Sequence, residues 1–112
     1  MEIPQRLRDG VAILEPKGRI TFGSGDEELR DAVRQALEGP SRNILVSMGE
    51  VSFIDSSGLG ELLAARTTVK NRGGDLKLLR LPPTVQDILQ ITSLFTLFEI
   101  HEDEDAAVAS FG

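Results

Sequence analysis

The sequence predicts a single α/β domain over residues 1–112, with a mixed, mainly parallel sheet of about five strands and about four helices packed on it. Three observations lead to this prediction: a hairpin pattern at the start, strand-like runs that alternate with helical periodicity, and a length typical of one domain. Hydrophobic residues make up 40% of the chain and charged residues 27%, which is sufficient for a folded core.

The chain begins with a predicted β-hairpin. Ile3, Gln5 and Leu7 follow a period of two, Asp-Gly at 9–10 is a tight-turn signal, and 11–14 is a continuous apolar run. We expect two antiparallel strands here. Gly18 and the glycine-rich segment 23–25 then interrupt the strand pattern.

A first helix is predicted over residues 26–38. Apolar residues recur at helical spacing from Leu29 to Leu37. Ser24 and Glu27 have the spacing of a capping box, and Gly-Pro at 39–40 ends the helix.

The later elements alternate between strands and helices. A short apolar run suits a central strand buried on both faces, and prolines suit the first turn of a helix, where a missing N–H costs nothing. In chain order we expect a central strand at 43–48, a buried run at 51–54, a helix ending near Arg72, a strand at 76–81, a helix opened by Pro82 and Pro83, a strand at 96–100 and a closing helix at 105–111.

Composition excludes several classes of protein. The net charge of −6 would repel nucleic acid and anionic lipid headgroups, so we expect neither nucleic acid nor a membrane as a direct partner. The chain has no cysteine, which excludes disulfides and cysteine-ligated zinc, and it shows no signal peptide and no membrane-length apolar run. We therefore expect a cytoplasmic protein without cofactor or metal.

The most informative segment is Asp55-Ser56-Ser57-Gly58-Leu59-Gly60, where a buried run meets a helix start. Free backbone N–H groups and the helix dipole make such a place hospitable to a phosphate, so Ser56 or Ser57 could carry one. Gly58 and Gly60 leave room for another chain to come close. The alternative is that a serine only caps the helix and the glycines only allow tight packing, and composition alone favours that alternative.

Two other segments are weaker candidates. Residues 23–26 lack the Lys-Ser/Thr of a phosphate-binding loop, so we interpret Gly23 and Ser24 as part of a surface loop that can contribute to a partner surface. His101 precedes the acidic run 102–105, which we interpret as a solvated helix start and not as a metal site. With one histidine and no Gly-x-Ser-x-Gly elbow, we expect a protein that is not an enzyme.

The segment 55–60 resembles the signature of the STAS domain, which occurs in bacterial anti-sigma factor antagonists and in the cytoplasmic tails of sulfate transporters. The resemblance covers nearly the whole chain, including Gly18, Gly73-Gly74 and residues 85–98. It implies a mixed sheet with four or so helices. It also implies phosphorylation of the first serine after the aspartate, Ser56 here, by an anti-sigma factor that is a Ser/Thr kinase, and reversal by a phosphatase.

The partner would then contact Asp55, Ser57, Gly58, Leu59 and Gly60, together with Gly23 and Ser24. Two positions differ from the usual family pattern. Thr21 stands where an acidic residue is common, and Ser47 stands where the central strand often carries Asp or Asn.

The leading hypothesis is an anti-sigma factor antagonist that sequesters the kinase and so frees a sigma factor for transcription. The alternative is a soluble STAS subunit of a membrane complex that transports lipids or anions. A small-ligand sensor is a third class, but five scattered phenylalanines offer little evidence for a ligand pocket.

Overall fold

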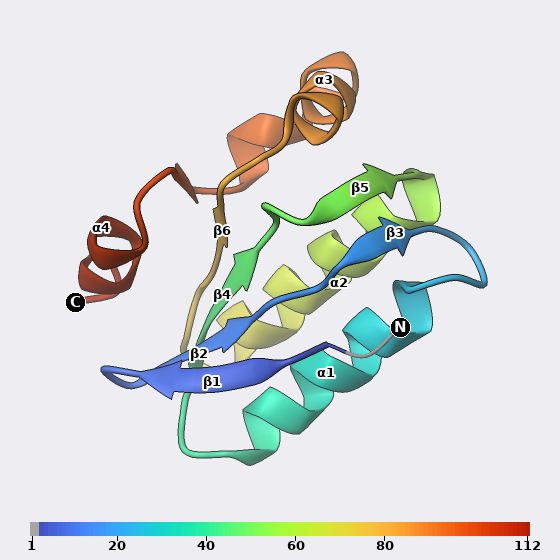
Figure 1. Cartoon of the computed structure of the whole chain (residues 1–112). Coiled ribbons are helices and arrows are strands. Elements are labelled where there is room, and N and C mark those ends of the chain that lie inside the picture. The colour runs from blue at the N-terminus through green and yellow to red at the C-terminus, as the bar shows by residue number, and fades with distance from the viewer. Residues whose placement is uncertain (1–2) are drawn as a thin grey trace.

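The structure, a computed structural model, describes residues 3–112 and has a five-stranded sheet with helices on both of its faces (Figure 1). The strand order is β1-β2-β4-β6-β7, where β1 pairs antiparallel with β2 and all other pairs are parallel. The bounds are β1 (Gln5–Arg8), β2 (Val11–Leu14), β4 (Asn43–Ser47), β6 (Leu76–Leu79) and β7 (Ile100–His101). The predicted mixed, mainly parallel sheet is confirmed.

The hairpin between β1 and β2 forms where the sequence predicts it. Asp9 and Gly10 both have positive φ, 49° and 80°, as the two central residues of a type I′ turn require. Gln5 lies opposite Leu14 and Arg8 opposite Val11, so the turn closes the ladder directly.

Residues 3–112 contain four α-helices, in agreement with the prediction. They are α1 (Asp26–Glu38), α2 (Ser56–Asn71), α3 (Pro83–Ile91) and α4 (Glu104–Ala109). α1 and α2 lie side by side on one face, and α4 lies on the other (Figure 1). α1 has the predicted bounds, and Pro83 occupies the first turn of α3.

Strands β2 and β4 are apolar on both faces because each face meets a different layer. Along β2, Ala12 and Leu14 join the large core beneath α1 and α2, whereas Val11 and Ile13 pack toward α4. In β4 the side chains of residues 44–46 are fully buried. This confirms the predicted central strand.

Residues 18–20 form a strand, although the sequence analysis predicted a break in the strand pattern at Gly18. β3 (Gly18–Ile20) pairs in parallel with β5 (Val51–Ile54) in a separate two-stranded ribbon. Gly18 has φ +87° and donates its backbone N–H to Glu50 O at 2.9 Å. Its left-handed backbone turns the chain out of the main sheet and onto β5, so the glycine redirects the chain without ending strand structure.

The predicted strand at 96–100 is wrong. Ser93 adopts φ +60°, and the chain then winds into the 3-10 helix η1 (Leu94–Leu97). Leu94 packs against the core. Only Ile100 and His101 pair with β6, because η1 includes residues 96 and 97 of the predicted strand.

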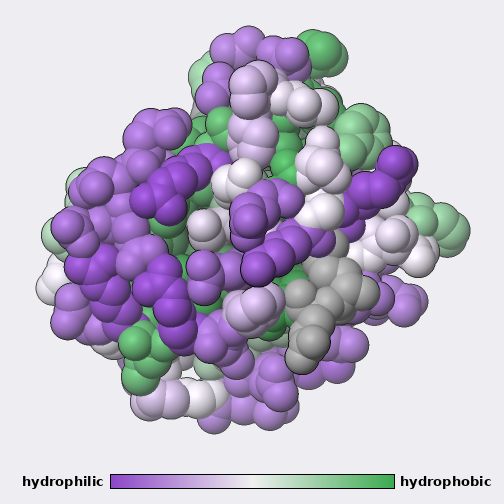
Figure 2. All heavy atoms as spheres, viewed as in Figure 1, coloured by the Kyte–Doolittle hydropathy of each residue, from purple (hydrophilic) through white to green (hydrophobic). Residues whose placement is uncertain are grey.

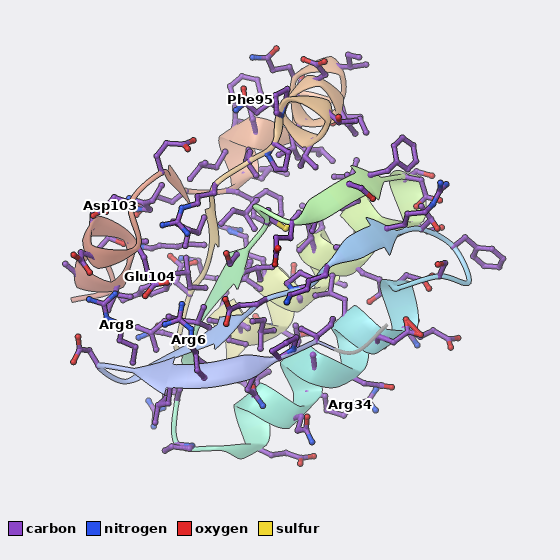
Figure 3. All side chains as sticks on the ribbon, in the orientation of Figure 1. Arg6, Arg8, Arg34, Phe95, Asp103 and Glu104 are labelled. Carbon is purple, nitrogen blue, oxygen red and sulfur yellow. The ribbon has the colours of Figure 1, made fainter. Side chains whose placement is uncertain are left out.

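Helix α4 is attached to the hairpin by ion pairs. Arg8 Nη1 lies 2.7 Å from Glu104 Oε2, Arg6 donates to both oxygens of Glu104, and Arg8 also pairs with Asp105 (Figure 3). The guanidinium groups, that of Arg6 first, lower the pKa of Glu104 to about 2. Glu104 and Asp105 of the acidic run are therefore paired with arginines, which corrects the interpretation of the run as merely solvated. Hydrophilic side chains gather on this side of the molecule (Figure 2).

A buried lysine fastens the other end of α4. Lys77 on β6 donates to Ser110 O and Oγ at 3.0 and 2.9 Å, and its Nζ lies 2.8 Å from Glu99 Oε2. The Phe111 ring lies 4.6 Å from the same ammonium group. Lys77, followed by His101, lowers the pKa of Glu99 to about 2.

Candidate partner-binding surface

Asp55 is the N-cap of α2. Its backbone is extended, and its Oδ1 accepts a hydrogen bond from the N–H of Gly58 at 2.9 Å. Ser56 is therefore the first residue inside the helix and not its cap. The cap role that composition alone assigned to a serine belongs to the aspartate before it.

The second oxygen of Asp55 connects this turn to the loop between β3 and α1. Asp55 Oδ2 accepts from the N–H of Phe22 at 3.1 Å, and the N–H of Asp55 donates to Ile20 O at 3.3 Å. Hydrogen bonds from Gly58 and Phe22 lower the pKa of the Asp55 carboxyl, Gly58 having the larger effect. The carboxylate is thus ionised and holds two segments together.

Ser56 is exposed and Ser57 half-buried. Within residues 3–112, neither hydroxyl makes a hydrogen bond to another group of the protein. Both residues lie in the first turn of α2, where the helix dipole presents partial positive charge. The Ser56 hydroxyl is therefore open to a partner protein or to modification.

The β3–α1 loop brings Gly23 and Ser24 to the same side of the molecule. Thr21 and Ser24 exchange two backbone hydrogen bonds of 2.7 and 2.9 Å, which close a tight turn with Gly23 and Ser24 exposed at its tip. The Thr21 side chain is buried. Residues 21–25 thus form an ordered turn beside the start of α2.

The predicted capping box of Ser24 and Glu27 is wrong. Gly25 is the N-cap of α1, with φ 96°, and no side chain caps the helix. Instead, the buried Asp26 accepts from the N–H groups of Gly23 and Glu27 through Oδ1, at 3.2 and 2.9 Å. Sequence reasoning missed the role of Asp26, whose carboxylate binds these two backbone N–H groups. Thr21, at the position where an acidic residue is common, is buried inside the loop.

Two predicted contact residues lie inside the protein. Leu59 is only 3% exposed, and a Cβ on Gly58 would lie 2.2 Å from Ile20 O. We therefore correct their assignment: Gly58 packs against Ile20 and Ile54 of the ribbon, Leu59 belongs to the core, and a partner cannot touch either in this conformation. Gly60 differs, because it is exposed and a Cβ there would meet no atom within 4 Å.

The structure adds two aromatic residues that the sequence did not single out. Phe22 is 82% exposed, and Phe53 on β5 is 36% exposed with the Arg19 guanidinium 5.4 Å from its ring centre. Apolar atoms are visible at the right margin of Figure 2, where Figure 1 places the β3–α1 loop. The signal in the sequence was a phenylalanine inside a polar, glycine-rich turn, where burial in the core would not account for an aromatic residue.

We call this region the Ser56 surface, defined as Phe22, Gly23, Ser24, Phe53, Ser56, Ser57 and Gly60. Exposed aromatic rings beside small polar residues are typical of the centre of a protein–protein interface.

His101, by contrast, lies on β7, where its Nε2 is 2.6 Å from Glu99 Oε2. No helix within residues 3–112 has the length and apolar character needed to cross a membrane.

Comparisons with known proteins agree with this architecture. The chain is 26% identical over 109 residues to the anti-sigma F factor antagonist of Paenibacillus polymyxa, covering 93% of this chain and 89% of that protein. It shares the fold of an anti-sigma factor antagonist from Mycobacterium paratuberculosis, with a TM-score of 0.84, 18% identity and coverage of 97% and 92%.

The fold is also similar to that of the Bacillus cell fate determinant SpoIIAA in its phosphorylated form, with a TM-score of 0.72, 21% identity and coverage of 96% and 97%. The model of the STAS domain matches residues 2–107, which is nearly the whole chain. The fold, the turn at residues 55–60 and this match together show that the chain belongs to the STAS domain family.

Proposed function

We propose that this chain is an anti-sigma factor antagonist switched by phosphorylation of Ser56. In the unphosphorylated state the Ser56 surface binds an anti-sigma factor that is a Ser/Thr kinase, and the sigma factor held by that kinase is released. The kinase then phosphorylates Ser56, the complex dissociates, and a Ser/Thr phosphatase restores the binding form. The protein itself acts by binding and not by catalysis.

The observation that carries this proposal is the position of Ser56. Ser56 is exposed in the first turn of α2, and Asp55 at the start of this turn binds the backbone N–H of Phe22, whose side chain is also exposed. A kinase active site can therefore reach the hydroxyl from the surface that the partner covers. The names of the relatives, among them an anti-sigma F factor antagonist, support the same function.

Electrostatics explains why a phosphate would end binding. Phosphorylation adds about −1.5 to −2 charges at pH 7 next to the Asp55 carboxylate. That carboxylate already accepts the N–H groups of Gly58 and Phe22, so fewer donors remain for the phosphate. A partner that packs over a neutral serine would have to desolvate a dianion, which is strongly unfavourable without a matching cation.

The test compares the wild type with Ser56→Ala and Ser57→Ala. Each protein is incubated with the anti-sigma factor kinase of the source organism and ATP, the phosphate is mapped by mass spectrometry, and binding is measured before and after. We expect phosphate on the wild type and on Ser57→Ala only, and loss of kinase binding once it is present. Phosphate on Ser57 alone would overturn the assignment to Ser56.

A pull-down from the source organism separates the two partner classes. The proposal expects the Ser/Thr kinase among the captured proteins, in amounts that fall for Ser56→Asp. Capture of a membrane transport ATPase without a kinase would overturn the proposal and favour a transport subunit. Because Asp carries less charge than a phosphate, the directly phosphorylated protein is the stronger comparison.

A further inference from the structure

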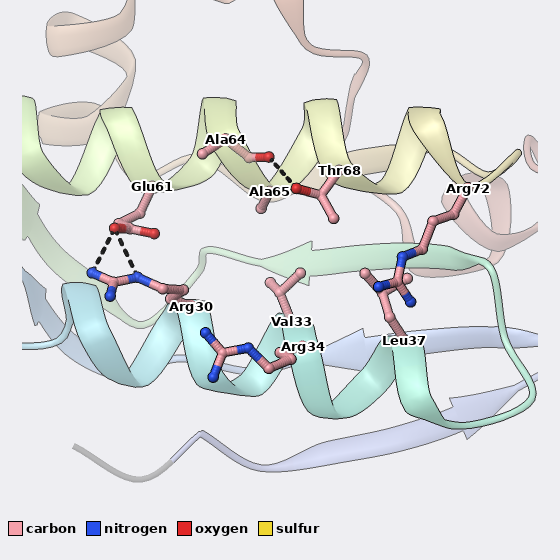
Figure 4. A pocket seen from close by; sticks show the side chains of 9 residues that line it. All are labelled: Arg30, Val33, Arg34, Leu37, Glu61, Ala64, Ala65, Thr68 and Arg72. Carbon is pink, nitrogen blue, oxygen red and sulfur yellow. Dashed lines mark hydrogen bonds and ion pairs between the residues drawn. The ribbon is translucent and has the colours of Figure 1, made fainter.

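A groove of about 360 Å³ runs between α1 and α2, and its lining shares no residue with the Ser56 surface (Figure 4). Its floor is aliphatic and consists of Val33 and Leu37 from α1 and Ala64 and Ala65 from α2. The two alanines leave the space that larger side chains would fill. The volume lies within the range of sites that bind small molecules.

Three arginines line this groove in a chain whose net charge is −6. Arg30 donates through Nε and Nη2 to Glu61 Oε1, at 3.2 and 2.9 Å, and so its charge is already matched (Figure 4). Arg34 has only a 3.5 Å contact to the exposed Asp31, and Arg72 forms no ion pair with any residue of the described chain. Two guanidinium groups are therefore available to an anion.

The dimensions favour a narrow, elongated ligand. Arg30 and Leu37 are two helical turns apart, which corresponds to about 10 Å along α1. None of the five phenylalanines lines the groove, so it offers no stacking surface for a planar ring. An aliphatic chain along the alanines, with an acidic head at a guanidinium group, matches both the floor and the charges.

We propose that the groove between α1 and α2 binds an unbranched aliphatic carboxylate of medium length. The carboxylate pairs with the guanidinium group of either Arg34 or Arg72, which lie at separate points of the groove, and the chain lies on Val33, Leu37, Ala64 and Ala65 (Figure 4). The third arginine, Arg30, pairs with Glu61 and is therefore not available to the ligand. This inference is independent of the proposed function, since none of these residues belongs to the Ser56 surface.

The experiment is a titration of the ¹⁵N-labelled protein, followed by amide chemical shifts, with octanoate as the probe. Octanol, which lacks the charge, and acetate, which lacks the chain, serve as ligand controls. We expect saturable shifts in α1 and α2 with octanoate. Either control should bind at least about tenfold more weakly than octanoate. Equal binding of octanol would overturn the role of the arginines, and equal binding of acetate would overturn that of the floor.

Three variants make the test specific. Arg34→Gln combined with Arg72→Gln should weaken octanoate binding about tenfold, whereas Arg42→Gln, which removes one positive charge at an exposed arginine outside the groove, should leave it unchanged. Glu61→Gln should strengthen binding, because it frees the Arg30 guanidinium. The three arginines are exposed and Glu61 is half-buried, so we expect the variants to keep the fold, which the dispersion of the amide spectrum verifies. An unaltered affinity in the double variant would overturn the proposal.

Discussion

The carboxylate of Asp55 accepts a hydrogen bond from the backbone N–H of Phe22, 3.1 Å away in space and 33 residues away in sequence. Its other oxygen caps α2 through Gly58. One side chain thus sets the start of the helix that carries Ser56 and the position of the loop that carries Phe22. The Ser56 surface therefore depends on this pair of contacts.

Asp55→Ala should lower the free energy of unfolding by about 2 kcal/mol, because it removes a helix cap and a second hydrogen bond to a backbone N–H. It should also weaken partner binding, since the β3–α1 loop is no longer tied to α2. Urea unfolding and a binding titration measure the two effects.

Asp103→Ala is the matched control, because Asp103 caps α4 by accepting from Ala106 N at 2.9 Å and makes no second contact of this kind. We expect it to lose about 1 kcal/mol and to bind the partner normally. Equal binding losses in the two variants would refute the link between Asp55 and the Ser56 surface.

Gly58→Ala and Gly60→Ala should have opposite effects on stability. A Cβ at Gly58 would lie 2.2 Å from Ile20 O and 2.6 Å from Ile54 Cγ1, so we expect a loss of about 1–3 kcal/mol or more. At Gly60 the space is open, and alanine should stabilise the helix by about 0.5–1 kcal/mol.

Thermal and urea unfolding decide between these outcomes. Gly60→Ala then becomes a probe of the interface, because it adds a methyl group to the Ser56 surface of a protein that is no less stable. Reduced kinase binding by this variant is expected if the partner's backbone comes close to the turn. A destabilised Gly60→Ala would contradict the open space at this position.

Phe22→Ala should weaken binding of the anti-sigma factor without affecting folding. An exposed aromatic ring at the centre of an interface contributes about 2 kcal/mol or more, which corresponds to an increase of about thirtyfold in Kd. Stability should change by less than about 0.5 kcal/mol, since the ring is 82% exposed.

Ile91→Ala is the control for this variant, because Ile91 on α3 has the same exposed fraction, 82%, and lies outside the Ser56 surface. Calorimetric titration of both variants with the kinase measures the difference. If Ile91→Ala lost as much affinity as Phe22→Ala, the partner surface would have been placed on the wrong part of the molecule.

The free energy of unfolding should decrease as the pH falls, because the carboxylates that attach α4 to the rest of the protein become protonated. Glu104 and Glu99 both have a pKa of about 2 in the folded chain, below the usual carboxyl value of 4.5. A lowered pKa stabilises the folded state fully above about pH 4.5, and that stabilisation is lost as the pH falls toward about 2. Urea unfolding at a series of pH values in this window measures the loss.

Glu104→Gln should reduce the slope of stability against pH in the same window, because the Arg6 and Arg8 pairs no longer depend on a proton. Glu102→Gln, at an exposed position without an ion pair in residues 3–112, serves as the control and should keep the slope. An unchanged slope in Glu104→Gln would show that other carboxylates govern the acid transition.

Local signals in the sequence were sufficient for much of the fold. The dipeptide at 9–10 selects a hairpin turn by its tolerance of positive φ, and the apolar spacing up to Leu37 together with Gly39 sets the bounds of α1. The place of Ser56 at a helix start follows in the same way from the residues on either side of it. These features depend on backbone preferences within a few residues, and such preferences can be derived from the sequence.

Only the tertiary structure decided which residues of the site face outward. Gly58 and Leu59 lie in the same motif as Ser56, yet both are buried, Gly58 against β3 and β5 and Leu59 in the core. Asp55 meets Phe22, and Glu104 meets Arg6 and Arg8, across 33, 98 and 96 positions. The groove between α1 and α2 likewise exists only once two helices pack side by side. Contacts of this kind arise from chain segments brought together by folding, and no local pattern of residues encodes them.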